Sequence, residues 1–272
     1  MRNSKTNELV LTGLFTAIII IMAFTPLGYI PLVVINATII HIPVILGSLF
    51  CGPKKGAFLG FVFGFTSCLK ATIVGGTLSS FVFSPVLAAS LVGTSGIFKS
   101  LFIAFVPRIL VGVIPYFVYI GIKKVLASEK KNLWGTVLNV LMSVFLAFGV
   151  YAFLGKMSES LSQAADLGIG IAVGAVVFIV VEAVFIRKST QVIPFVYAGV
   201  AGAMTNTLLV MGSIFVLYKD AYADAIGVAG NAVLGVITGV ISFNGVIEAI
   251  VAAIIVYLVG LVLNTIKPIA AK

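Results

Sequence analysis

Long apolar runs, separated by short polar or charged segments, repeat along the whole chain. A transmembrane helix needs about 20 mostly apolar residues. By this measure the pattern predicts eight spans, of which the second is the shortest and contains His41 and Pro43. The predicted spans are 9–25, 37–52, 56–74, 102–122, 133–155, 167–186, 191–218 and 241–266.

Two connections between these spans are long. Residues 75–101 are apolar but interrupted by glycine, serine and Pro85, which favours a re-entrant or lid-like segment over a mobile surface loop. Residues 219–240 carry Lys219, Asp220 and several glycines, so they are expected to form a second outer connection.

Small residues recur at the four-residue spacing that lets helix backbones approach closely. Gly56, Gly60 and Gly64 form a double G-x-x-x-G, for which packing within this chain is the favoured interpretation. Gly13 and Ala17 form a similar stripe on the first span, where a partner protein could dock.

The amino-acid composition disfavours most classes of soluble protein. Hydrophobic residues make up 61% of the 272 residues, charged residues only 9%, and the mean hydropathy is +1.26. Soluble domains carry roughly a quarter charged residues. A soluble enzyme, a nucleic-acid-binding domain and a disulfide scaffold are therefore disfavoured, and an all-α polytopic membrane protein in one membrane domain, 1–272, is expected.

The net charge of +9 fits a topology signal. With the N-terminus in the cytoplasm, twelve Lys and Arg residues fall on cytoplasmic segments, four fall on outer loops, and Arg108 lies within a span. Cytoplasmic loops are enriched in Lys and Arg. Eight spans with both termini cytoplasmic are therefore self-consistent.

Polar side chains within the predicted spans gather towards the outer half of the membrane. Such groups are costly in a bilayer, so each is a functional hypothesis. A binding cup open to the outside is predicted, in which Lys70 or Arg108 takes a carboxylate and the other groups contact hydroxyls or amides. The alternative to a binding cup is a network that only holds helices together, with Arg108 paired to Glu248. Glu182, at the inner end of its span, is expected to have a structural role and not to belong to the cup. The predicted cup residues are Thr38, His41, Ser67, Lys70, Arg108, Asn206, Asn244 and Glu248.

Motifs for other chemistry are missing from the sequence. It contains no G-x-x-x-x-G-K-[ST], H-E-x-x-H or G-x-S-x-G, and one His with two separated Cys residues forms no metal-ligand pattern. We therefore predict no enzymatic activity, no cofactor and no metal. A stand-alone secondary transporter and a membrane scaffold remain as alternatives.

Several motifs together resemble the substrate-binding S component of energy-coupling factor (ECF) vitamin transporters, and most of all the pantothenate-type branch. They are the stretch 37–47, the stretch 52–64 with Ser67, and the segments 24–32, 83–85, 107–112 and 205–207. The resemblance covers about 1–125 and 191–266.

The resemblance implies a six-helix bacterial cell-membrane protein that captures a vitamin outside the cell. It implies delivery with a transmembrane T component and two cytoplasmic ATPases, and docking through Gly13 and Ala17. Tyr29 and the aromatic residues of 81–83 are expected to cap the site. Pantothenate is the expected substrate, and a pyridoxamine-like or pyrimidine-type vitamin is the alternative. Residues 126–190 depart from the six-helix pattern and are interpreted as an inserted helical hairpin, although one of its helices could instead be the fifth helix of the family.

Overall fold

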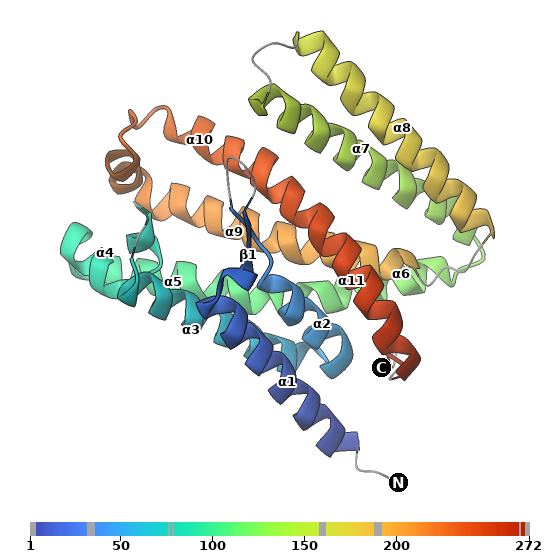
Figure 1. Ribbon diagram of the computed structural model, residues 1–272, viewed down its shortest axis with the longest axis horizontal. Coiled ribbons are helices and arrows are strands. Elements are labelled where there is room, and N and C mark those ends of the chain that lie inside the picture. The colour runs from blue at the N-terminus through green and yellow to red at the C-terminus, as the bar shows by residue number, and fades with distance from the viewer. Residues whose placement is uncertain are drawn as a thin grey trace.

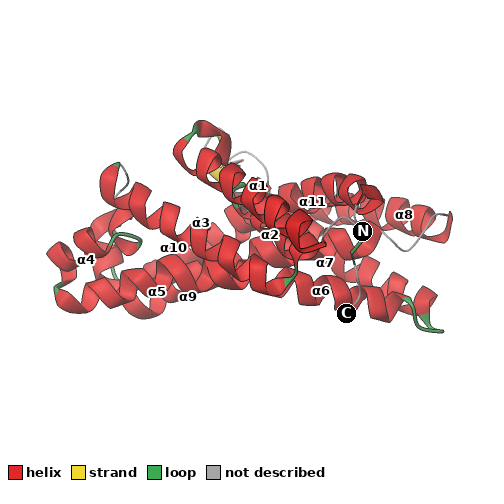
Figure 2. Cartoon of the chain, turned by 90° about the horizontal axis from the view of Figure 1, so that it is seen from below, coloured by secondary structure: helices red, strands yellow, loops and turns green. Residues whose placement is uncertain are grey.

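The computed structural model describes residues 4–31, 36–75, 77, 79–157, 162–187, 192–266 and 268–269. Nearly all of this described chain is helical, and a two-stranded antiparallel ribbon, β1 (Tyr29–Pro31) with β2 (Asn36–Thr38), follows the first helix (Figures 1 and 2). The helices are α1 (Ser4–Phe24), α2 (His41–Cys51), α3 (Pro53–Ile73), α4 (Pro85–Val92), α5 (Thr94–Val111), α6 (Ile114–Leu126), α7 (Lys131–Met157), α8 (Gln163–Arg187), α9 (Val192–Ile226), α10 (Val233–Val240) and α11 (Val246–Ile266).

Seven helical stretches of the described chain are long and apolar enough to cross a membrane, which confirms a polytopic membrane protein. The predicted span 37–52 differs, because α2 has only eleven residues. Its rise of about 16 Å is roughly half of the hydrocarbon thickness. Every residue from His41 to Phe50 is buried, so α2 is enclosed by other helices instead of facing lipid.

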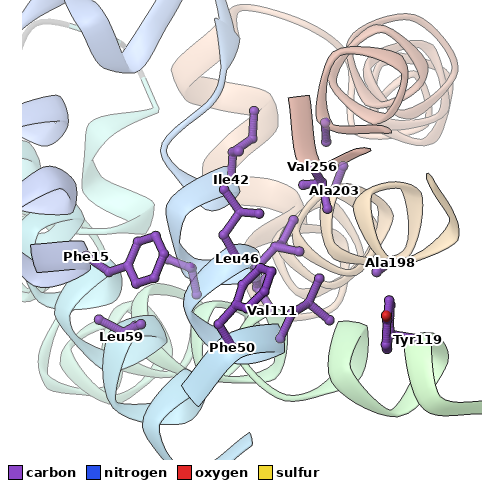
Figure 3. Packing of buried hydrophobic residues seen from close by; sticks show 14 of the residues in the cluster. Phe15, Ile42, Leu46, Phe50, Leu59, Val111, Tyr119, Ala198, Ala203 and Val256 are labelled. Carbon is purple, nitrogen blue, oxygen red and sulfur yellow. The ribbon is translucent and has the colours of Figure 1, made fainter. Parts of the chain in front are cut away.

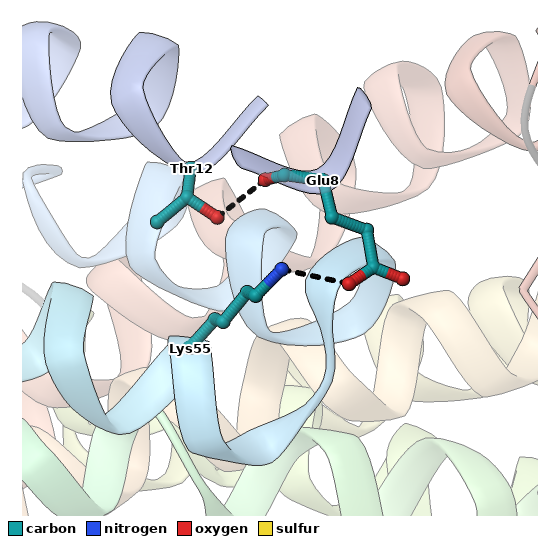
Figure 4. Close-up of polar contacts among 3 residues, drawn as sticks. All are labelled: Glu8, Thr12 and Lys55. Atoms are coloured by element: carbon teal, nitrogen blue, oxygen red, sulfur yellow. Dashed lines mark hydrogen bonds and ion pairs between the residues drawn. The ribbon is translucent and has the colours of Figure 1, made fainter. Parts of the chain in front are cut away.

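The path of the chain nevertheless agrees with the predicted topology. Lys55 Nζ on α3 lies 2.7 Å from Glu8 Oε2 on α1, and the Thr12 hydroxyl donates to the Glu8 carbonyl (Figure 4). This pair joins the first turns of α1 and α3, which places both helix starts at one end of the molecule. The chain therefore returns between them, and α2 makes that return.

Small residues allow α3 and α5 to pack with their backbones in contact. A Cβ atom at Gly56, Gly60 or Gly64 would overlap the backbone of α5 or the residue after it, most severely at the carbonyls of Gly112 and Arg108. The hydroxyl of Ser48 on α2 also donates to the Gly112 carbonyl, at 2.6 Å. The predicted internal packing of the double G-x-x-x-G is therefore confirmed.

Most of the buried apolar side chains form two clusters. The first lies among α1, α2, α3, the end of α5, α6, α9 and α11 and includes Phe15, Leu46, Leu59 and Val111 (Figure 3). The second lies around Phe81 and joins the segment before α4 to α5, α9 and α10.

The two long connections are more helical than expected. Residues 75–101 include a short 3-10 turn (Ser80–Val82), all of α4 and the start of α5, and α4 packs on α5. The expected connection 219–240 is largely helical. The helix α9 is kinked at Tyr218, whose backbone is not helical, and a further helical stretch follows to Ile226 before α10 starts at Val233. The predicted end of the span at residue 218 therefore coincides with the kink.

The α7–α8 hairpin lies at one side of the molecule, with α8 outermost (Figure 1). Polar groups join its two helices. Glu182 accepts hydrogen bonds from Thr136 Oγ1 at 2.6 Å and Asn139 Nδ2 at 2.9 Å. Glu182 thus joins α8 to α7 through neutral hydrogen-bond donors.

Candidate functional site

A cavity of about 480 Å³ lies between the two apolar clusters. It borders Phe63 of the first cluster and Val210 of the second. Six segments that are distant in sequence contribute to it, namely β2, α3, residues 75–83, α5, α9 and the stretch 240–248. Its polar and charged lining residues are Thr38, Ser67, Lys70, Thr77, Ser80, Arg108, Asn206, Thr207, Asn244 and Glu248.

Arg108 is held in one position at the cavity wall. Its NH1 group donates to the Ile103 carbonyl at 2.7 Å. The guanidinium carbon lies 4.6 Å from the ring centre of Phe83 and 5.5 Å from that of Phe63. A cation over an aromatic face is attracted by the ring quadrupole, and more strongly where water is excluded. Arg108 is 6% exposed, so the two rings and the backbone bond fix a cation that is largely shielded from solvent.

Lys70 supplies a second positive charge to the same cavity. It lies in the last turn of α3, and its Nζ donates to the Ala23 carbonyl near the end of α1 at 3.0 Å. An ammonium group has three donors, so this bond occupies one of them. The cavity lining therefore carries two positively charged side chains, Lys70 and Arg108.

Glu248 supplies a negative charge from α11. Its Oε1 accepts the backbone N–H of Thr38 at 2.9 Å, and its Oε2 accepts the hydroxyl of Thr207 at 3.1 Å. A carboxylate can accept about four hydrogen bonds, so Glu248 retains capacity for a ligand donor.

Neutral polar groups complete the lining. Asn206 on α9 is 8% exposed, and its Oδ1 accepts no hydrogen bond from the described residues. Buried polar atoms nearly always have a partner, so such an atom at a cavity wall indicates a place for a donor from a ligand or water. Asn244 lies on a π-helical turn, Ile241–Gly245, that joins α10 to α11. Such turns often occur at functional sites.

Seven of the predicted cup residues are brought together by the fold: Thr38, Ser67, Lys70, Arg108, Asn206, Asn244 and Glu248. Arg108 lies in the last turn of α5.

His41 is not among the residues that line the cavity. It is the first residue of α2 and is fully buried, and neither ring nitrogen has a hydrogen-bond partner in the described chain. The chain reaches the cavity at Thr38 and then turns into the enclosed helix, which leaves His41 in the protein interior. Tyr29 lies on β1, and its side chain falls outside the described part of the structure.

Phe63 and Thr207 have roles in this geometry that the sequence did not indicate, and Phe83, expected as part of a cap over the site, lines the cavity and contacts Arg108. The two rings position Arg108, and Thr207 holds Glu248. Thr207 directly follows Asn206, which is the sequence signal that could have identified it. Phe63 is one of 21 phenylalanines and carries no such signal.

The fold and the cavity define a class of protein. It is a multi-pass helical membrane protein with a polar pocket whose lining carries two positive side chains and one negative side chain. Residues 7–186 match the model of the substrate-specific component of ECF transporters. This match covers more than half of the chain, so the chain belongs to that family, which consists of transporters and not enzymes. It is a multi-pass protein of the bacterial cell membrane.

Two relatives carry specific names. The chain is 42% identical over 161 residues to the pantothenic acid transporter PanT of Lactococcus lactis subsp. cremoris, covering 55% of this chain and 78% of the relative. It is 27% identical over 277 residues to the pantothenate transporter PanT of Leuconostoc mesenteroides subsp. mesenteroides, covering 100% of this chain and 98% of the relative. The S-component resemblance is thereby confirmed, and both relatives are named for the vitamin of the expected branch.

Proposed function

We propose that this protein is the pantothenate-binding subunit of an ATP-driven ECF importer. The observation that carries the proposal is the cavity in which Lys70 and Arg108 lie together with the carboxylate of Glu248. Its volume of about 480 Å³ falls in the range of small-molecule sites. The names of the two relatives support the same vitamin.

The chemistry of pantothenate matches the distribution of charge. The molecule has a carboxylate at one end, an amide in the middle and two hydroxyl groups at the other end. Lys70 and Arg108 receive the carboxylate, since a guanidinium can bind it with two parallel hydrogen bonds. Glu248 accepts a hydroxyl group, and Asn206 with Asn244 reads the amide. Ser67 and Thr38 complete the polar wall.

The orientation in the membrane follows the charge distribution of the loops. Both termini lie in the cytoplasm, and the cavity receives the vitamin from outside. Energy comes from a T component and two cytoplasmic ATPases that assemble with this chain. The docking surface is the stripe on α1, where Gly13 and Ala17 are exposed and a Cβ atom at Gly13 would meet no other residue within 4 Å.

The α7–α8 hairpin is an addition to a six-helix core. The packing supports this assignment, because the first apolar cluster draws its buried residues from the other long helices and from α2. The hairpin meets that core through α7, while α8 packs on α7.

Uptake of radiolabelled pantothenate tests the proposed function. The chain is expressed in bacteria that lack their own pantothenate uptake, with and without a T component and the two ATPases. Uptake that requires all three partners, and that excess pyridoxamine or thiamine leaves unchanged, is the expected result. Uptake by the chain alone would identify a secondary transporter instead. Uptake competed by another vitamin would reassign the substrate.

A further inference from the structure

The helix α7 has two faces with different chemistry. One face meets α8 through polar contacts, in which Asn139 Nδ2 donates to the Phe178 carbonyl at 2.9 Å and to Glu182. The other face is apolar and meets the core, with Leu138 and Phe145 packed against buried clusters. The hairpin is therefore held together by its own polar seam and rests on the core along one stripe.

That apolar stripe ends on the π-helical turn beside the cavity. Phe153 of α7 stacks on Phe243, with ring centres 5.0 Å apart and parallel planes. One turn earlier, Gly149 is buried against Val246, and a Cβ atom at Gly149 would overlap the Val246 side chain. Contact this close requires glycine, so the backbone of α7 lies directly against residues 243–246.

The same turn presents a different face to the cavity. Val240, Asn244 and Glu248 line it, at intervals of four residues. In a regular α-helix, residues four apart drift by about 40° around the axis. The π turn, Ile241–Gly245, interrupts this regular spacing between Val240 and Glu248 and so sets where Asn244 lies along the cavity wall. Phe243 and Val246, on the other side, are buried and contact α7.

We propose that the hairpin buttresses the binding cavity, with Phe153 and Gly149 acting as positioning residues for Asn244. Neither residue lines the cavity. They act by pressing on the π turn, so that Asn244 stands at the cavity wall without a ligand to hold it there. This inference rests on the proposed function, because its readout is the affinity for pantothenate.

Equilibrium binding of radiolabelled pantothenate to the purified full chain in detergent tests the inference. In Phe153→Ala and Gly149→Ala the Kd is expected to rise about fivefold to tenfold, which corresponds to one weakened hydrogen bond. Phe148→Ala is the matched control, because Phe148 lies on the same helix and is 52% exposed. It is expected to bind like the wild type.

Two further variants separate positioning from simple loss of structure. Phe153→Leu keeps an apolar side chain of similar size without the ring stack, and is expected to fold and to show the same weakened binding. Adding Val246→Ala to Gly149→Ala makes room for the new methyl group and is expected to restore affinity.

The decisive comparison is made in an Asn244→Ala background. If the hairpin acts through Asn244, adding Phe153→Ala to Asn244→Ala causes no further loss of pantothenate affinity. Full additivity of the two changes would overturn the inference, and so would wild-type affinity in Phe153→Leu and Gly149→Ala. In either case pantothenate binding by the wild type would leave the proposed function standing. Absence of binding by the wild type would instead refute the proposed function and this inference with it.

Discussion

Replacing Arg108 with alanine removes the guanidinium that lies against the rings of Phe63 and Phe83 at the cavity wall. If this group receives the carboxylate of pantothenate, the variant should lose affinity for the acid but not for an analogue that lacks the charge. Pantothenol, which has an alcohol in place of the carboxylate, is that analogue.

The expected size of the effect follows from burial. Arg108 is 6% exposed, so water screens its interaction with a bound anion only weakly. A hydrogen bond to a charged group contributes about 1.5–3 kcal/mol, or roughly 10- to 150-fold in Kd. The wild type should therefore prefer pantothenate to pantothenol by a factor in this range, and Arg108→Ala should lose most of that preference.

Competition against radiolabelled pantothenate, in detergent at fixed salt, measures both affinities. Lys99→Ala is the control, because Lys99 also lies over an aromatic ring, that of Tyr218, yet does not line the cavity. It should keep the wild-type preference. An Arg108→Ala protein that is folded and still prefers pantothenate by the wild-type factor would refute the assignment of Arg108 to the carboxylate.

Three other predictions concern a cavity residue, the packing of α3 on α5 and the proposed docking surface on α1. Glu248→Ala leaves the half-buried backbone N–H of Thr38 without its acceptor, so the melting temperature and the pantothenate affinity should both fall, with a loss of about 1–3 kcal/mol in unfolding free energy; an unchanged melting curve would contradict this. Gly60→Leu should abolish folding, judged by size-exclusion chromatography, because α3 and α5 cannot approach, whereas Gly121→Leu, at a position with open space, should fold. Gly13→Leu should keep pantothenate binding but lose uptake by the assembled transporter, and full uptake would remove α1 as the docking surface.

The cavity residues were accessible to sequence reasoning because polar groups in membrane helices are rare and costly. Lys70, Arg108 and Glu248 are conspicuous in apolar runs for that reason. His41 fulfilled the same criterion, yet it lies inside the protein. The hydropathy pattern predicts that a polar residue lies within the membrane, but not whether its side chain faces a cavity or the packed interior of the protein.

Other features depend on contacts that leave no local signal. The ring of Phe63 acts only because the fold brings it to Arg108, and nothing distinguishes it from other phenylalanines in the sequence. The stacking of Phe153 on Phe243 joins residues that are distant in the chain. The charged residues Lys219 and Asp220 marked the position of the kink at Tyr218, but not the further helical stretch that follows it to Ile226.

The most direct test is equilibrium binding of radiolabelled pantothenate to the purified wild-type protein, with unlabelled pantothenate, pyridoxamine, thiamine, riboflavin and biotin as competitors. Saturable binding that only pantothenate displaces, and that Arg108→Ala weakens, is the predicted result. A folded protein that binds no pantothenate, or that another vitamin occupies in preference, would contradict the assignment of this cavity to pantothenate.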